Sequence, residues 1–244
     1  MKTFIAAMLL LVCGICSAQG APGGRTKNPA TYPTEVQLRT AIKNAAKLLK
    51  AEHLDVEIFD AQKVGLARPL VASRLSRDGA ACLVFYNTKP EDGLTQFFAT
   101  IAANDLPLLL TAIAMHEATH CVEQREAYVR NRFDKVLPPG SGSDSATAKG
   151  YLWAVNNGSL ETWGEALADI VSLLYLKQAA PERWLPLATG IAGMRRDLAS
   201  KWPEHDTSPW LHQIIAADAD TDAIMNQNLF ETAFQLRRKY RPGG

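Results

Sequence analysis

The chain has 244 residues, 47% hydrophobic and 21% charged, which are the proportions of an ordinary globular protein rather than a disordered one. Its 26 basic and 25 acidic residues give a formal charge of +1, so no charge imbalance points to nucleic acid as a partner. A chain of this length can bury a substantial core and is most simply one domain.

Residues 1–18 have the pattern of a secretory signal peptide. Lys2 supplies the positive start, Phe4 to Cys16 is apolar, and Ala18 ends a small-residue cleavage site. The apolar run is too short for a bilayer, which takes about 20 residues. We therefore expect an exported protein, periplasmic or secreted, with no transmembrane segment in the mature chain. An uncleaved anchor or a lipoprotein is the alternative.

After this segment we expect a flexible leader over 19–33 and a single domain over 34–244. Residues Thr34 to Glu52 are apolar at helical spacing, and Thr34 with Gln37 has the spacing of a capping box. Alternation and turn residues then predict a strand over 54–59, one or two strands within 64–86 and a short helix within 91–103.

Residues Asp105 to Asn131 read as one long helix, apolar nearly all round at first and polar later. It contains His116-Glu117-Ala118-Thr119-His120. Histidines four apart leave the same helix face, so both imidazoles can bind one metal ion. Catalytic zinc keeps one position open for water, and a glutamate after the first histidine can act on that water as a general base. A chance match on an ordinary helix is the alternative.

A zinc ion on two histidines needs a third protein ligand, and a second helix over 161–177 offers one. Glu165 and Asp169 are four apart and share a face, so we expect Glu165 on the metal. Asp169 would accept the far ring N–H of a ligating histidine, which fixes the tautomer. Glu161, one turn earlier, is the competing ligand. The alternative is that Glu161 and Glu165 are solvated charges.

H-E-x-x-H followed by E-x-x-x-D on a second helix resembles the gluzincin group of zinc metallopeptidases. The form Glu165-Ala-Leu-Ala-Asp169 is closer to the motif of the heat-shock and CAAX-prenyl endopeptidase family and its soluble periplasmic relatives. The resemblance covers roughly residues 105–212. It implies one zinc ion and a zincin-like α+β fold, mainly helical, with a small sheet packed against the metal-binding helix. It also implies a catalytic role for His205, although three residues separate His205 from Pro209 where the family has them adjacent.

Two cysteines, Cys82 and Cys121, remain after signal-peptide cleavage. An even number in an oxidising compartment predicts a disulfide that joins the metal helix to a strand beginning at Cys82. Two unconnected buried thiols are the alternative.

Residues 136–149 are rich in Pro, Gly and Ser and predict a flexible loop between the two metal helices. From 158 onward the chain reads as about four helices, with breaks near 180–181, 202–203 and 219–220. The basic run from Arg237 to Arg241 reads as a solvated helix end.

These features predict a zinc-dependent peptidase that cleaves peptides or proteins with a metal-activated water and Glu117 as general base. His205, His212 and Tyr151 are the candidates for stabilising the negative oxygen that forms on the substrate. The alternative is a catalytically inactive exported domain that binds a metal or a partner, against which the intact Glu117 argues. The sequence does not indicate an oligomeric state.

Overall fold

The computed structural model describes residues 30–66, 70–90, 92–217 and 228–242; the predicted signal peptide and most of the predicted leader lie outside these ranges. The helices are α1 (Glu35–Leu49), α2 (Asp92–Ala99), α3 (Leu106–Tyr128), α4 (Phe133–Val136), α5 (Ala148–Asn156), α6 (Glu161–Ala179), α7 (Trp184–Leu198), α8 (Ser208–Ala216) and α10 (Leu229–Lys239). The strands are β1 (Asp55–Asp60), β2 (Val71–Leu75) and β3 (Ala81–Tyr86). Short 3-10 helices are η1 (Lys50–Glu52), η2 (Gln62–Val64), η3 (Ser143–Ser145) and η4 (Pro203–His205).

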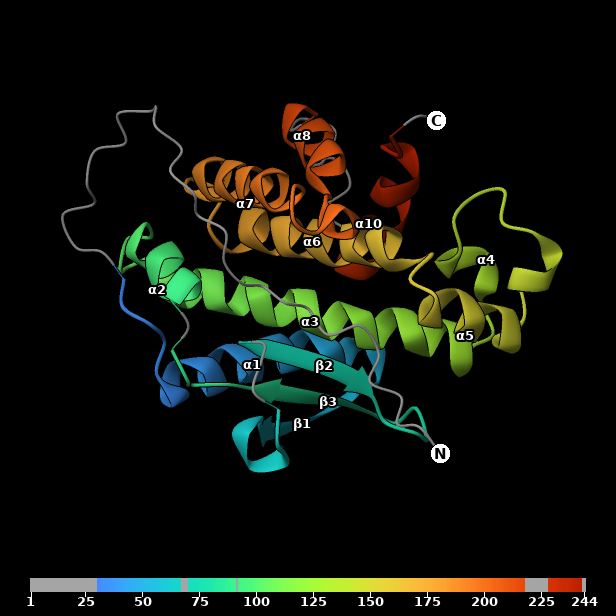
Figure 1. Cartoon of the computed structure of the whole chain (residues 1–244), viewed down its shortest axis with the longest axis horizontal. Helices are drawn as coiled ribbons and strands as arrows, with labels where there is room; N and C mark the ends of the chain where they lie inside the picture. Colours follow the sequence, from blue (N-terminus) through green and yellow to red (C-terminus); the bar gives the residue numbers. More distant parts are fainter. Residues whose placement is uncertain (1–29, 67–69, 91, 218–227, 243–244) are drawn as a thin grey trace.

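The elements are arranged in layers around α3. Figure 1 shows α3 crossing the middle of the molecule, with the sheet and α1 on one side and α6 on the other. Beyond α6 lie α7, α8 and α10, which all contact α6. The expected α+β class is confirmed: the chain is mainly helical, and a small sheet packs against α1 and against α3, the predicted metal-binding helix.

The first helix forms where the capping box predicts. The Thr34 hydroxyl accepts a hydrogen bond from the Gln37 N–H, and the Gln37 side chain accepts one from the Thr34 N–H. The apolar positions of α1 are buried at helical spacing: Leu38, Ala41, Ile42, Ala45 and Leu49. This face packs α1 against α3 and the sheet.

The sheet has the strand order β1-β3-β2, with β1 parallel and β2 antiparallel to β3. β2 and β3 form a hairpin whose turn places Gly79 at φ +72°, a conformation that glycine adopts without strain. The Ser73 hydroxyl on β2 donates to the backbone carbonyl of Glu117 at 2.5 Å, which ties the edge strand to the centre of α3.

The predicted disulfide between Cys82 and Cys121 is formed, and both residues are fully buried. It joins β3 to α3 at the residue after His120. The part of α3 that carries the predicted histidine ligands is therefore covalently attached to the central strand.

The two long helices α3 and α6 approach each other closely beside the predicted ligands. A Cβ on Gly164 would lie 3.2 Å from Oε2 of Glu123 on α3, so a larger residue would crowd this crossing. Further along, the Ser172 hydroxyl donates to the Ala112 carbonyl at 2.8 Å. The glycine allows a close approach of α3 and α6, and the buried hydrogen bond ties these two helices together.

The interpretation of the basic tail as a solvated helix end is wrong for Arg237. Its side chain is 0% exposed, because α10 lies over α6. It donates to Oε1 of Glu123 at 2.6 Å and to the backbone carbonyl of Trp163 at 2.8 Å. The guanidinium also lies 4.2 Å from the centroid of the Trp163 ring, a cation–π contact. Arg237 thus links the C-terminal helix to both α3 and α6.

Two predicted flexible segments contain ordered structure. At the end of the predicted leader, the Ala30 N–H donates to the Ile101 carbonyl at 2.7 Å, and Tyr32 packs on Phe98. The predicted loop over 136–149 contains η3 and the first residues of α5. Helix α5 begins at Ala148 because the Thr147 hydroxyl caps it by accepting from the Gly150 N–H at 3.0 Å.

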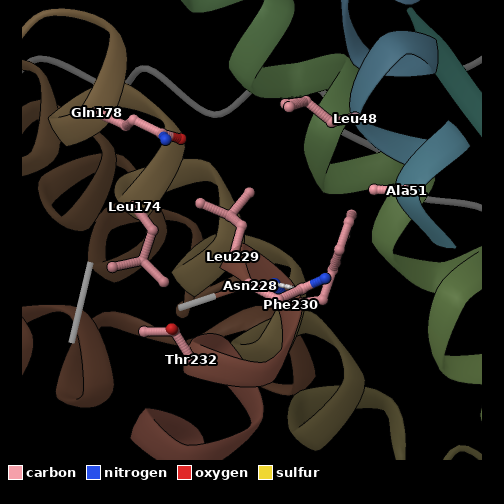
Figure 2. Close-up of a pocket in the computed structure, with 8 residues that line it drawn as sticks. All are labelled: Leu48, Ala51, Leu174, Gln178, Asn228, Leu229, Phe230 and Thr232. Carbon is pink, nitrogen blue, oxygen red and sulfur yellow. Dashed lines mark hydrogen bonds between the residues drawn. The ribbon is translucent and has the colours of Figure 1, made fainter. Parts of the chain in front are cut away.

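A hollow of about 160 Å³ lies where α1, α6 and the start of α10 meet (Figure 2). Its walls are Leu48, Ala51, Leu174, Gln178, Asn228, Leu229, Phe230 and Thr232. None of these residues is a predicted ligand, and Leu174 lies nine residues beyond Glu165 on α6, about 13 Å along the helix.

Within the described part of the chain, no helix combines the length and the apolar character that crossing a membrane requires.

Candidate metal centre

Helix α3 presents both predicted histidine ligands on one face. The His116 and His120 rings are 5.1 Å apart at their centroids and nearly perpendicular. Their Nε2 atoms are buried, and neither has a hydrogen-bond partner among the described residues. A buried polar atom without a partner is costly, so two such atoms side by side point to a ligand that binds between them.

Glu165 on α6 faces both histidines. Its Oε2 lies 3.4 Å from Nε2 of His116 and its Oε1 lies 3.4 Å from Nε2 of His120. The three residues offer ligand atoms within 4.8 Å of one another. Ligands held tetrahedrally at the usual zinc distances are about 3.3 Å apart. The donor types, their spacing and the two unpartnered nitrogens therefore fit one metal ion at His116, His120 and Glu165.

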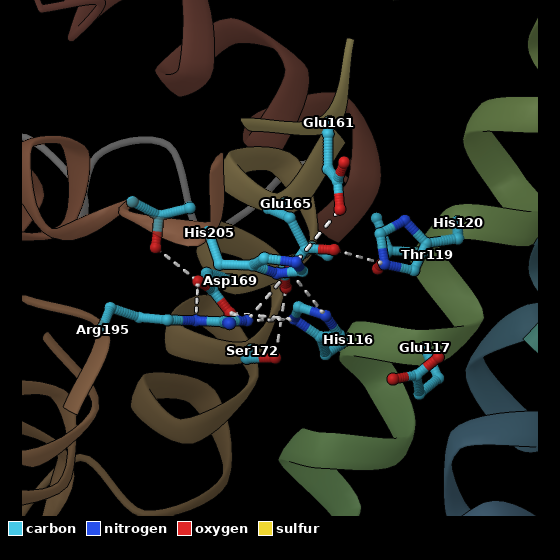
Figure 3. Close-up of polar contacts among 12 residues, drawn as sticks. His116, Glu117, Thr119, His120, Glu161, Glu165, Asp169, Ser172, Arg195 and His205 are labelled. Carbon is cyan, nitrogen blue, oxygen red and sulfur yellow. Dashed lines mark hydrogen bonds and ion pairs between the residues drawn. The ribbon is translucent and has the colours of Figure 1, made fainter. Parts of the chain in front are cut away.

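Asp169, one turn beyond Glu165, contacts the first histidine from behind. Nδ1 of His116 donates to Oδ1 of Asp169 at 2.8 Å (Figure 3). This hydrogen bond holds a proton on Nδ1 and directs Nε2 toward Glu165, where a bound metal ion would take the place of any proton on Nε2. The structure thus brings Asp169 to the position that the sequence analysis assigns to it.

Arg195 on α7 is part of this cluster and is absent from the sequence analysis. Its guanidinium is 2% exposed and contacts both acidic residues of α6, Glu165 and Asp169. A sequence signal does exist for it. Ala188, Ile191, Ala192 and Arg195 are the buried residues of α7 after Trp184 and have the spacing of one helix face. An arginine on an apolar face predicts a buried acidic partner.

The cluster shifts the pKa values of its members in opposite directions. Burial alone would lower the pKa of His116, but the charges of Glu165 and Asp169 raise it to about 10. Burial would raise the pKa of Asp169, but Arg195 and His116 lower it to about 2. Burial likewise opposes the ionised form of Glu165, and His116 holds its pKa well below the usual value. The site therefore keeps both carboxylates ionised, as metal binding requires.

Glu117 lines an apolar cavity that His116 and Asp169 also line. In Figure 3 its side chain extends from α3 apart from the dashed contacts of the candidate metal cluster. The other polar residues that line the cavity are His116, Asp169, Ser172 and Arg195, and its apolar walls are Phe97, Leu109, Ala112, Ile113, Ile191 and Met194. Among the described residues, none donates a hydrogen bond to the Glu117 carboxylate. Burial raises the pKa of Glu117, because an ionised carboxylate is poorly solvated there.

Glu161 does not join the two histidines. It belongs instead to a neighbouring group with Glu204 and His205, whose ligand atoms also lie within 4.8 Å of one another. Nε2 of His205 lies 3.0 Å from Oε1 of Glu161, and its Nδ1 lies 3.4 Å from Oε2 of Glu165. His205 therefore stands between the two glutamates that compete as ligands in the sequence analysis.

The other two residues considered for stabilising the substrate oxygen lie elsewhere. Tyr151 packs its ring on Tyr128 and Phe133, and His212 is exposed on α8. In the described part of the chain, neither contacts the two histidines or Glu165. Of the three candidates, the structure brings only His205 to the cluster.

Comparisons with family models, with curated proteins and with solved structures give no match to this chain. What the structure shows is a buried candidate metal group of His116, His120 and Glu165 in a mainly helical α+β fold.

Proposed function

We propose that the protein is a zinc-dependent peptidase that hydrolyses peptide bonds, with a zincin-like arrangement of its two metal helices. One observation carries this proposal. Two unpartnered histidine nitrogens and a carboxylate from a second helix converge, and a second buried carboxylate lies beside them. Structural zinc sites have four protein ligands, whereas hydrolytic sites have three and an adjacent acid.

His116, His120 and Glu165 would hold the ion. Two imidazoles and one carboxylate suit zinc, whereas calcium and magnesium prefer sites built from oxygen alone. When bound, the ion supplies Lewis-acid polarisation and makes water acidic enough to ionise near neutral pH.

Glu117 would be the general base of the reaction. It accepts the proton of the attacking water and then passes it to the leaving amine of the substrate. Its carboxylate has no hydrogen bond among the described residues, which leaves it free to accept the proton, and burial raises its pKa, which makes it a stronger base. A catalytically inactive metal-binding domain has no need for a buried, unpartnered acid at this place.

His205 would stabilise the negative charge that develops on the substrate carbonyl oxygen. Burial lowers the pKa of His205, but the Glu165 carboxylate outweighs this effect and raises it, which favours the charged imidazole. In this structure Nε2 of His205 lies 3.0 Å from Oε1 of Glu161. To act on the substrate, Nε2 would have to contact the substrate oxygen in addition to Glu161 or in its place.

We also propose that the protein is exported and acts outside the cytoplasm. The disulfide between Cys82 and Cys121 fits an oxidising compartment. The N-terminal pattern of residues 1–18 supplies the signal. Mass spectrometry of the protein from culture medium or periplasm should find a mature chain that begins at Gln19; an intact N-terminus on the cellular protein would contradict this.

The test of the function compares Glu117→Gln with the wild type and with His116→Ala. We expect wild type to bind close to one zinc per chain and to cleave members of a quenched fluorescent peptide library. Glu117→Gln should retain the zinc and lose at least 100-fold in rate, the usual order for a general base. His116→Ala should lose both. Zinc binding without cleavage of any peptide, simple ester or simple amide would favour the inactive metal-binding domain.

A further inference from the structure

We propose that Arg195 is a positioning residue that holds two acidic groups of the metal centre in their binding orientation. The inference rests on the proposed zinc site, to which it adds a residue from a third helix. Arg195 reaches the cluster from α7, which packs on α6 opposite α3. Figure 3 shows its guanidinium lying across Asp169 and pointing toward His116 and Glu165.

The guanidinium binds Asp169 with two parallel hydrogen bonds. Nε donates to Oδ2 at 2.7 Å and Nη2 donates to Oδ1 at 2.8 Å. Such a fork fixes the plane of a carboxylate as well as its position. The Thr207 hydroxyl donates to Oδ2 at 2.5 Å and His116 donates to Oδ1. Each oxygen of Asp169 therefore has two donors, and its orientation toward His116 is fixed from both sides.

The same guanidinium also restrains a metal ligand directly. Nη2 of Arg195 donates to Oε2 of Glu165 at 3.1 Å, in addition to its bond to Asp169. One planar group thus connects the carboxylate that orients His116 to the carboxylate that faces the ion position. The side chains of His116, Glu165, Asp169 and Arg195 are all buried, so solvent competes little for these hydrogen bonds.

Removing Arg195 has two opposing effects on zinc affinity. A guanidinium this close repels a divalent ion, and its loss alone would strengthen binding. Its loss also leaves two buried carboxylates short of donors and free to rotate. We expect the second effect to be larger, because loss of a residue that orients a metal ligand typically weakens binding by about 10–100-fold.

The experiment measures zinc affinity by competition with a chromogenic chelator for wild type, Arg195→Met and Arg195→Lys. Arg195→Met should bind about 10–100-fold more weakly than wild type. Arg195→Lys should recover only part of this loss, since an ammonium supplies charge without the planar fork. The visible spectrum of the cobalt-substituted Arg195→Met protein should also change, because the geometry of Glu165 and His116 around the ion changes.

Arg237→Met is the matched control. It also removes a fully buried arginine that pairs with a glutamate and contacts α6, but its partner is Glu123 and not a ligand. It should lower the stability of the fold while leaving the zinc affinity and cobalt spectrum close to wild type. Equal losses of affinity in Arg195→Met and Arg237→Met would show that Arg195 is merely structural and would overturn the proposal.

Two further variants keep the test decisive if Arg195→Met does not fold. Thr207→Val removes one donor to Asp169 without changing charge, so it should weaken zinc binding by less than Arg195→Met. In an Asp169→Asn background, Arg195→Lys should cost less affinity than in wild type, because part of its effect passes through Asp169. Full additivity of these two changes would contradict the proposal. Failure of wild type to bind zinc would instead refute the proposed function.

Discussion

His116 and Glu117 are neighbours in the chain, yet their side chains enter different environments. His116 faces two carboxylates and a guanidinium, whereas Glu117 enters an apolar cavity. Both pKa values are raised, the first by negative neighbours that outweigh burial and the second by burial. Near neutral pH and without a metal, His116 is therefore a charged imidazolium whose Nε2 proton a zinc ion would displace, whereas Glu117 is a more basic carboxylate than an exposed glutamate.

The raised pKa of His116 gives the zinc-free protein a pH-dependent stability. A pKa of about 10 in the folded protein, against 6.5 in the unfolded chain, stabilises the fold fully below about pH 6.5. This contribution is lost as the pH rises through about 10, at about 1.4 kcal/mol for each pKa unit. The free energy of unfolding of chelator-treated protein should therefore fall more steeply between pH 7 and 10 than that of His116→Gln. Parallel pH profiles for the two proteins would exclude a charged His116.

Zinc affinity should distinguish the roles of Glu165 and Glu161. The two carboxylates are one turn apart on α6, but only Glu165 faces both histidines. Glu165→Gln should weaken zinc binding strongly, because a neutral amide replaces a charged ligand. Glu161→Gln should change it less than tenfold, since its partner is His205. Chelator competition on both variants measures this, and a larger loss in Glu161→Gln would reverse the assignment of the third ligand.

The elements differ in how completely the sequence specifies them. The capping box at Thr34 and the long apolar run before His116 predict α1 and α3 because both signals are local. The pairing of Cys82 with Cys121 follows from the presence of only two cysteines after residue 18. Helix α5 is not predicted, because its N-cap Thr147 lies at the end of a Pro-, Gly- and Ser-rich segment that reads as a loop.

The sequence predicts the candidate ligands and misses the residue that orients them. His116, His120, Glu165 and Asp169 fall in two short motifs, each within one helix turn or two. Arg195 lies 26 residues beyond Asp169, and its burial depends on how α7 crosses α6. A tertiary crossing of this kind leaves only an indirect trace in the sequence, here an arginine at a position that should be apolar.

The disulfide between β3 and α3 should be a major source of stability. Closing a loop with a sequence separation of 39 residues restricts the unfolded chain by about 4 kcal/mol in the chain-entropy description. We expect the double variant Cys82→Ala, Cys121→Ala to unfold at lower denaturant concentration, with a loss of roughly 2–4 kcal/mol. Its zinc affinity should fall less, because Asp169 on α6 still orients His116 and Arg195 on α7 still contacts Glu165. Denaturant titration and chelator competition on the same variant would separate the two effects, and unchanged stability would contradict the first expectation.

At the scale of the whole molecule, the candidate metal centre lies between α3 and α6, the two helices at the middle of the fold. The hydrophobic cluster extends from α1 and the sheet through α3 and α6 to α10, so an ion between α3 and α6 acts on the centre of the fold. Ligand binding to the folded state stabilises it in proportion to the logarithm of the free ligand concentration.

Zinc should therefore raise the thermal unfolding temperature of the entire chain. At a free concentration about 1,000 times the dissociation constant, the added stability is about 4 kcal/mol. Calorimetry of chelator-treated wild type with and without zinc measures the shift, and His120→Ala should show little of it. A similar shift in that variant would place the stabilising ion elsewhere on the protein.

The most direct measurement is a crystal structure of the zinc-loaded wild-type protein with anomalous diffraction at the zinc edge. We expect one strong anomalous peak in contact with Nε2 of His116, Nε2 of His120 and a carboxylate oxygen of Glu165. A peak held by Glu161, Glu204 and His205 without the two α3 histidines, or no peak between α3 and α6, would contradict it.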